Sequence, residues 1–180
     1  RKDIDKKNTW DLTPLFKTES EWDELYKQVE SKIDTYNSFK GKLSESLKNL
    51  RGVIEFDLEI SRDIEKLYTY AHLKSDEDKG NQQYQALYQR AINLYMRISE
   101  LSSYITPEIQ QIDDAVIQKY ISDESMKLYG FYFENILRYK PHTRNQEIEE
   151  ILAQSGEVAG TAGQVFSQLD TGYSKKSGTG

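Results

Sequence analysis

The sequence Tyr-Gln-Ala-Leu-Tyr-Gln-Arg-Ala-Ile-Asn-Leu-Tyr-Met-Arg-Ile-Ser-Glu-Leu-Ser, residues 84–102, carries the clearest structural signal in the chain. Its apolar and tyrosine side chains recur at steps of three and four, which places them on one face of an α-helix. This face consists of Tyr84, Tyr88, Ala91, Tyr95, Ile98 and Ser102, and it is widened by Leu87, Leu94 and Leu101. The segment is therefore predicted to be a helix roughly 30 Å long, at about 1.5 Å per residue.

A second amphipathic helix is predicted directly before this one. Its apolar face consists of Leu47, Leu50, Ile54, Leu58, Ile64, Leu67, Tyr68 and Ala71. The pattern slips near Gly52, which indicates a kink or a short break. The polar run at 74–81, Lys-Ser-Asp-Glu-Asp-Lys-Gly-Asn, supplies turn residues between the two segments. The two helices are therefore expected to pair as a long antiparallel hairpin.

Further start signals indicate helices on both sides of this hairpin. Thr18 and Glu21 form a capping box, in which each side chain satisfies a free amide of the first turn. Thr106 is placed to cap another helix with Pro107 at its first position, and Asp113 can restart a helix after a small break. No segment shows the sustained alternation of a β-strand. The sequence therefore predicts an all-α fold, a multi-helix array of about six or seven helices.

A short apolar segment, Trp-Asp-Leu-Thr-Pro-Leu-Phe at residues 10–16, precedes the first of these helices. It is too short, and too interrupted by proline, to form a helix of its own. We expect an extended arm or a short turn that inserts Trp10, Leu12 and Phe16 into the body of the domain.

A sharp corner between two helices is predicted within residues 136–153. Pro141 ends the incoming helix, because proline has no amide donor and its ring clashes with the preceding turn. Thr143 and Gln146 then form a capping box that starts the next helix. His142 lies between them, where it is expected to bond a carbonyl or a tyrosine hydroxyl and so orient the turn. A role for His142 as a base or a metal ligand is the alternative.

Three regions are expected along the chain. Residues 1–8 are polar and are predicted to be flexible. Residues 9–170 carry the helical patterns and form the all-α region, while residues 171–180 lose all periodicity and are typical of a flexible tail. Because the chain begins with Arg1, we interpret it as processed or as a piece of a longer protein. The tail has three interpretations: a linker, a truncated reading frame or a trimmed product.

Composition excludes several classes of protein. The 180 residues include no cysteine, which excludes a disulfide scaffold, a thiolate zinc site and a cysteine nucleophile. The net charge is -6 and no basic stripe is visible, so nucleic acid is not an expected partner. No run of about 18 apolar residues occurs, so no segment is expected to span a membrane.

No catalytic, metal-binding or cofactor-binding residue is predicted. The chain has two histidines, His72 and His142, and neither lies in the paired arrangement with a glutamate that a zinc-peptidase helix requires. His72 ends an apolar face, so a half-buried structural role is favoured over a functional one. The 13 tyrosines are expected to pack at the core and its rim, with a hydroxyl-lined wall of a peptide cleft as the alternative.

Five segments, in this order, resemble the N-terminal region of oligoendopeptidase F, which belongs with the thimet-oligopeptidase-like zinc metallopeptidases. They are Trp-Asp-Leu-Thr-Pro-Leu-Phe at 10–16, Phe-Lys-Gly-Lys-Leu at 39–43, Leu-Tyr-Thr-Tyr-Ala-His-Leu-Lys-Ser-Asp-Glu-Asp at 67–78, Tyr-Gln-Ala-Leu-Tyr at 84–88 and Leu-Arg-Tyr-Lys-Pro-His-Thr at 137–143. Each motif is weak alone, but five in register are fairly specific. The resemblance covers about residues 9–170.

The resemblance implies an all-α protein of two lobes around a deep channel, which hydrolyses short unstructured peptides in the cytoplasm. In that family the zinc ligands lie in the C-terminal half, on a His-Glu-x-x-His helix and a downstream glutamate. Zinc is therefore expected in the parent enzyme and not in this chain, and no catalytic or metal role carries over to any position here. The chain alone is expected to be inactive.

The resemblance also implies the partners. This chain would form one wall of the substrate channel, with the C-terminal catalytic half of the peptidase and short peptides in the assembled channel as its partners. A lobe without its counterpart is expected to self-associate through exposed apolar surface. The alternative function is a free-standing helical module that binds a peptide or another protein in a groove.

Overall fold

The structure is a computed structural model that describes residues 10–140. Within that range every regular element is a helix, so the predicted all-α class is confirmed. The elements are α1 (Glu19–Lys32), η2 (Ile33–Thr35), α2 (Tyr36–Phe39), α3 (Leu47–Glu77), α4 (Gln82–Ser102), α5 (Ile105–Gln111), α6 (Asp114–Ile121), η3 (Glu124–Tyr129) and α7 (Gly130–Tyr139). The chain divides into two compact units, Arg1–Arg138 and Tyr139–Gly180, and α1 to α6 lie in the first.

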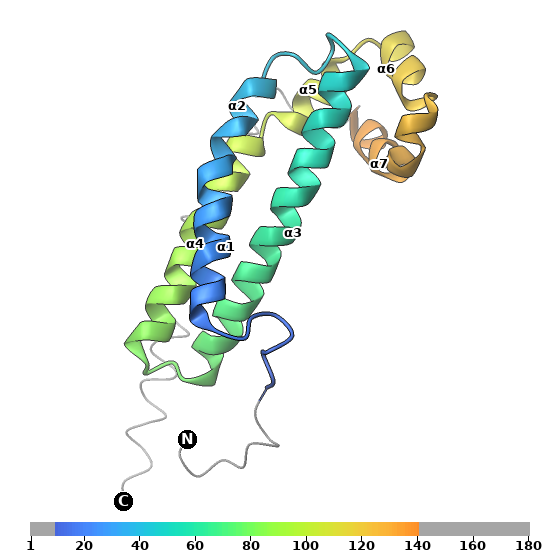
Figure 1. The fold of residues 1–180 in the computed structure, drawn as a ribbon. Helices are drawn as coiled ribbons and strands as arrows, with labels where there is room; N and C mark the ends of the chain where they lie inside the picture. The colour runs from blue at the N-terminus through green and yellow to red at the C-terminus, as the bar shows by residue number, and fades with distance from the viewer. Residues whose placement is uncertain (1–9, 141–180) are drawn as a thin grey trace, which may run out of the picture. The chain divides into compact units, whose positions relative to one another are not determined.

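The long antiparallel hairpin is confirmed as α3 and α4. Figure 1 shows these two helices and α1 side by side, with α5, α6 and α7 at the end of the bundle where α3 begins. The hairpin turn is held by side chains, since Asp78 accepts a hydrogen bond from the amide of Gly80 and Asn81 accepts from the amides of Gln83 and Tyr84. These bonds satisfy the free amides at the start of α4.

Of the kink or short break predicted near Gly52, the break is wrong, because α3 continues without interruption from Leu47 to Glu77. Gly52 has a packing role instead. A Cβ atom at this position would lie 3.1 Å from Cε1 of Phe39, so the absent side chain leaves room for the Phe39 ring against α3. The irregularity in the hydrophobic pattern at Gly52 therefore indicates a close approach of the Phe39 ring to α3 and not the end of a helix.

Helix α1 is fixed to one face of the hairpin by Trp22. This side chain is fully buried, and its indole N–H donates a hydrogen bond of 2.9 Å to the carbonyl oxygen of Leu67 in α3. The guanidinium of Arg90 in α4 lies 4.9 Å from the centre of the Trp22 ring and 4.5 Å from that of Tyr26. Arg90 also pairs with Asp23 at 2.8 Å. Trp22 of α1 therefore contacts both helices of the hairpin, at Leu67 of α3 and at Arg90 of α4.

The predictions for the start of α1 and for the arm before it are partly confirmed. The cap at Thr18 is confirmed, since its hydroxyl accepts from the amide of Glu21. The arm before it inserts Leu12 and Phe16 into the core as predicted, but Trp10 is 55% exposed, so its predicted burial is wrong.

The predicted start of the helix at Thr106 is also wrong. Helix α5 begins at Ile105 after Tyr104, and neither Tyr104 nor any other side chain caps it. The reason is a contact between residues far apart in the sequence. Tyr104 is buried and donates a hydrogen bond of 2.7 Å from its hydroxyl to the carbonyl oxygen of Tyr36, which places the start of α5 in the core. Asp113 does restart the chain as predicted, as the N-cap of α6.

A single carboxylate holds the loop between α2 and α3. Glu108 of α5 accepts hydrogen bonds from the amide of Gly41 at 2.8 Å and from that of Leu43 at 2.7 Å. Gly41 has φ of 78°, a left-handed conformation that favours glycine. The hydroxyl of Tyr120 in α6 bonds the carbonyl oxygen of Ser44 at 3.1 Å. Helices α5 and α6 are therefore tied to the loop that leads into α3.

The Trp22 contact generates the first testable prediction. Replacing Trp22 with phenylalanine removes the indole donor and part of the buried ring, so we expect the free energy of unfolding to fall by about 1–3 kcal/mol. Urea unfolding followed by circular dichroism measures this change. The matched control is Trp10→Phe, at the exposed tryptophan, which should change the stability by no more than about 0.5 kcal/mol. Equal losses in the two variants would contradict the assigned role of Trp22.

Candidate functional site

The predicted structural corner lies outside the described residues. Pro141, His142, Thr143 and Gln146 all follow residue 140, so their proposed roles stay predictions. The helix before them agrees with the sequence argument, since α7 ends at Tyr139, shortly before the proline.

A cluster of four rings from α3 and α4 is the most concentrated group of polar aromatic side chains in the described part of the chain. We define the tyrosine–histidine cluster as Tyr68, His72, Tyr88 and Tyr95. The Tyr68 ring lies 5.8 Å from His72 in a stacked arrangement, 5.6 Å from Tyr88 and 6.1 Å from Tyr95. His72 lies 5.2 Å from Tyr88. The hydroxyls of Tyr68 and Tyr88 are hydrogen-bonded to each other at 3.0 Å, which fixes the two rings.

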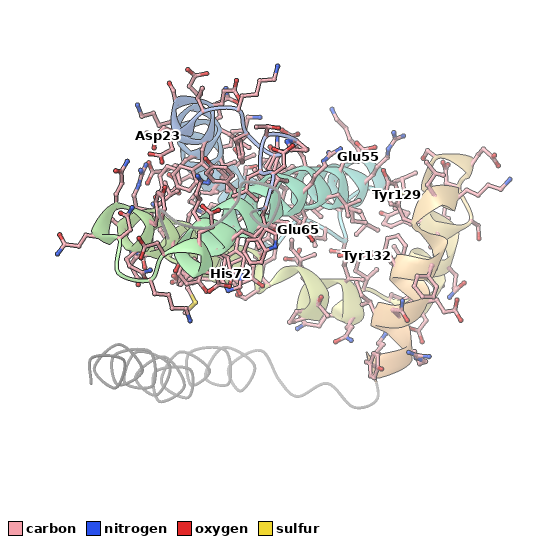
Figure 2. All side chains as sticks on the ribbon, turned by 90° about the horizontal axis from the view of Figure 1, so that it is seen from below. Asp23, Glu55, Glu65, His72, Tyr129 and Tyr132 are labelled. Atoms are coloured by element: carbon pink, nitrogen blue, oxygen red, sulfur yellow. The ribbon has the colours of Figure 1, made fainter. Side chains whose placement is uncertain are left out.

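The cluster lies on the face of the hairpin that α1 does not cover. Figure 2 shows His72 on the side of the hairpin away from Asp23 of α1. The predicted half-burial of His72 is confirmed, with 43% of its side chain exposed and its Nε2 atom 3.5 Å from Oδ2 of Asp76. Tyr95 is 52% exposed. Burial, followed by the bond to Tyr68, raises the pKa of the Tyr88 hydroxyl, so this group stays neutral. The cluster therefore presents aromatic rings and tyrosine hydroxyls at an accessible surface.

A second polar group fixes the end of the bundle around Asp57. The hydroxyl of Tyr36 donates to Oδ1 of Asp57 at 2.8 Å, and Tyr104 bonds the backbone of Tyr36. Burial raises the pKa of the Asp57 carboxyl, although the bond from Tyr36 acts in the opposite direction. Burial, together with the nearby Asp57, raises the pKa of Tyr132 to about 12. These groups connect elements rather than line an open site, so we interpret them as structural.

The segment from η3 to α7 contacts α3 and also carries exposed apolar side chains. Tyr129 donates its hydroxyl to Oε1 of Glu55 in α3 at 3.2 Å, and Figure 2 shows these two residues facing each other. Leu128 and Phe131 are 90% and 76% exposed. They are three positions apart, so they lie on the same side of this segment. We refer to these two residues as the Leu128–Phe131 patch.

Residues 10–140 do not fit a metal site of the kind that the resemblance implies for the parent enzyme. In this range no group of three or more histidine, aspartate or glutamate side chains lies close enough together to hold a metal ion. The acidic turn after α3 uses Asp78 to bond a backbone amide instead. Of the helices in the described range, none is long and apolar enough to cross a membrane.

Sequence spacing identified the tyrosines of the candidate site but not the cluster. The steps of three and four placed Tyr88 and Tyr95 on one face of α4, and Tyr68 lay on the face of α3. Their meeting point depends on the register between the two helices, which helical periodicity does not contain. His72 was assigned a structural role, and its stacking on Tyr68 had no signal in the sequence.

Known proteins match the chain over most of its length. A family model described as Oligopeptidase F matches residues 108–173. Oligopeptidase PepF of Bacillus subtilis is 33% identical over 171 residues, which are 94% of this chain and 26% of the relative. Group B oligopeptidase PepB of Streptococcus agalactiae is 35% identical over 94% of this chain and 28% of its own length.

The fold matches as well. The crystal structure of oligoendopeptidase-F from Enterococcus faecium superposes with a TM-score of 0.76 at 36% identity, over 84% of this chain and 29% of that protein. The chain thus spans between a quarter and a third of the length of these relatives, at 26% to 29%.

The half-buried carboxyl of Asp57 generates a prediction about pH. Because its folded pKa is raised, the stability that it contributes is present below the unfolded pKa and is lost as the pH rises through the folded pKa. Asp57→Asn keeps an oxygen for the Tyr36 bond but carries no charge. We expect the wild type to lose stability relative to this variant as the pH rises from 4 to 7, measured by urea unfolding at each pH.

Asp123 provides a control of opposite sign. Its bonds from the hydroxyl and the amide of Ser125 lower the pKa of its carboxyl, so the stability that it contributes is present at neutral pH and is lost as the pH falls. The wild type should therefore gain stability relative to Asp123→Asn as the pH rises from 3 to 7. Parallel pH profiles for Asp57→Asn and the wild type would contradict the assignment of Asp57.

Proposed function

We propose that this chain, which is homologous to the N-terminal region of oligoendopeptidase F, is the N-terminal helical lobe of a zinc metallopeptidase of that family. The resemblance inferred from five sequence motifs is confirmed by the relatives and by the matching fold. The observation that carries the proposal is the combination of 94% coverage of this chain with 26% coverage of the relative. A match of this kind is expected for one part of a larger enzyme.

In the proposed enzyme, this lobe forms one wall of the channel that admits short peptides in the cytoplasm. The rest of the enzyme would supply zinc and the hydrolytic groups, since residues 10–140 offer no set of side chains that fits the metal. The 31 residues of α3 and the 21 residues of α4 form a long rigid surface. A narrow cleft with such a wall would admit an extended peptide and exclude a folded domain.

The Leu128–Phe131 patch supports a role as part of a larger assembly. Two large apolar side chains that are 90% and 76% exposed on the same side of one segment offer a surface that a partner can cover. We propose that the C-terminal part of the peptidase covers this patch. The same observation supports the second candidate function, a free-standing helical module that binds a different protein.

Exchange of the matching region between relatives tests the proposed lobe. We expect a chimera in which residues 1–173 of this chain replace the matching region of the Bacillus subtilis relative to cleave a quenched fluorescent peptide. A chelator should abolish the cleavage, because the hydrolysis requires zinc. The control is the same relative with its matching region deleted, which should be inactive.

The chain by itself should show no turnover of the same peptide with added zinc. Chelator-sensitive cleavage by the isolated chain would contradict the proposal, and so would a chimera that folds but does not cleave. Specific binding of the isolated chain to an unrelated protein, together with an inactive chimera, would favour the interaction module.

The exposed patch generates a separate prediction. Light scattering of the isolated chain should give an average mass that rises with concentration, because Leu128 and Phe131 expose apolar surface. The double variant Leu128→Ser, Phe131→Ser should reduce this rise. The control is Gln28→Ser on an exposed, uncharged residue of α1, which should leave it unchanged. A constant monomer mass over a wide concentration range would contradict the prediction.

A further inference from the structure

We propose that η3 and α7 form a preformed docking segment, which presents the Leu128–Phe131 patch to the C-terminal part of the peptidase, with Tyr129 and Glu55 as positioning residues. The inference rests on the proposed function, because that function supplies the partner. It adds how the patch is held outward and which side chains hold it there.

The docking segment has two apolar faces, and the inner face is already buried. Met126 and Phe133 are fully buried, and Tyr129 lies between them at steps of three and four. Leu128 and Phe131 lie on the other side, where they are 90% and 76% exposed. Turning these two side chains inward would expose Met126 and Phe133 to water instead. Rotation of the segment therefore cannot bury the patch, and its cover would have to come from another surface.

A hydrogen bond between side chains fixes the docking segment on α3. The hydroxyl of Tyr129 donates to Oε1 of Glu55 at 3.2 Å, and Nε of Arg51 donates to the same oxygen at 2.7 Å. Arg51 and Glu55 are four positions apart in α3, so the acceptor is itself held by its own helix. Because Tyr129 lies between Leu128 and Phe131 in the sequence, this bond sets the direction in which the patch points. A surface that is ordered before binding loses less conformational entropy when it docks.

The partner that fits the patch best is the rest of the peptidase. The match to the Bacillus subtilis relative covers 26% of that protein, so nearly three quarters of it lies outside the match. The patch lies within residues 108–173, the part of this chain that the Oligopeptidase F model matches. Leu128 and Phe131 have purely apolar side chains, and permanent interfaces are more hydrophobic than transient ones. A second copy of this chain is the alternative occupant.

Thiol labelling measures whether the patch is covered. The chain has no cysteine, so Leu128→Cys and Phe131→Cys each introduce one reactive group and leave the other apolar side chain in place. Each variant is labelled with N-ethylmaleimide in the isolated chain, at a concentration where light scattering shows a monomer, and in the Bacillus subtilis chimera. Mass spectrometry of the cysteine-containing peptide gives the rate. Labelling should be at least about tenfold slower in the chimera, because a covered thiol reacts only after local opening.

The matched control is Gln28→Cys at an exposed position of α1, whose labelling rate should be the same in the isolated chain and in the chimera. Equal rates for Leu128→Cys in the two proteins would overturn the proposal. Protection that is lost when the chimera is diluted would also overturn it, because it would identify a second copy as the occupant. Cover from within the same molecule does not depend on concentration.

Variants of the bond to Glu55 test the positioning residues in the Leu128→Cys chimera. Tyr129→Phe and Glu55→Ala both remove the bond, so labelling should become about two- to fivefold faster. Glu55→Gln keeps an acceptor oxygen and should retain the protection. In the isolated chain the same changes should leave the rate unchanged, because the thiol is exposed with or without the bond. The control is Tyr95→Phe at an exposed tyrosine of α4, and the positioning role fails if Tyr129→Phe labels no faster than this control.

Labelling and cleavage are separate measurements, so this proposal and the proposed function can fail separately. A chimera that cleaves the peptide but is labelled as fast as the isolated chain would overturn the docking segment and leave the lobe assignment intact. A protected patch in a folded chimera that does not cleave would do the opposite.

Discussion

The buried side chain of Trp22, whose indole N–H donates a hydrogen bond to the carbonyl oxygen of Leu67, holds α1 on one face of the hairpin. A tryptophan N–H that is buried without a partner is costly, so this bond allows a large ring to fill the space between α1 and the hairpin. Arg90 covers the same ring and pairs with Asp23 of α1. Because α1 is held on this side alone, the opposite face of α3 and α4 retains its tyrosines for other contacts.

At the end of the bundle, hydrogen bonds between side chains and backbone position the helices. The hydroxyl of Tyr36 donates to Asp57, and the hydroxyl of Tyr104 donates to the backbone of Tyr36. Such bonds fix orientation more strongly than apolar burial does, because they require a specific distance and angle. The raised pKa of Asp57 shows that its burial disfavours the charged form. The bonds at this end therefore hold α5 in a defined place, at some cost in stability at neutral pH.

The sequence predicted the elements of the fold well and their contacts poorly. The hairpin and the caps at Thr18 and Asp113 were predictable, because periodicity and capping act within a few residues of each other. The cap at Thr106 was wrong because a bond between Tyr104 and Tyr36, far apart in the sequence, moved the helix start. Gly52 was misinterpreted for the same reason, since its role depends on a ring from another element. The candidate site needed the register of two helices, which is a tertiary quantity.

The two exposed surfaces differ in their chemistry. A wall of the proposed channel would have to remain stable when the channel is empty and still bind when it is filled. Tyrosine suits both conditions, because its ring packs on a neighbour while its hydroxyl remains hydrated or bonded, as in the pair of Tyr68 and Tyr88. Leu128 and Phe131 have no polar atom in their side chains, so exposing them to water is unfavourable. Burial of both side chains against another surface would be favourable. Permanent interfaces are the more hydrophobic class. The patch therefore suits a fixed partner, whereas the tyrosine–histidine cluster is compatible with lasting exposure to water.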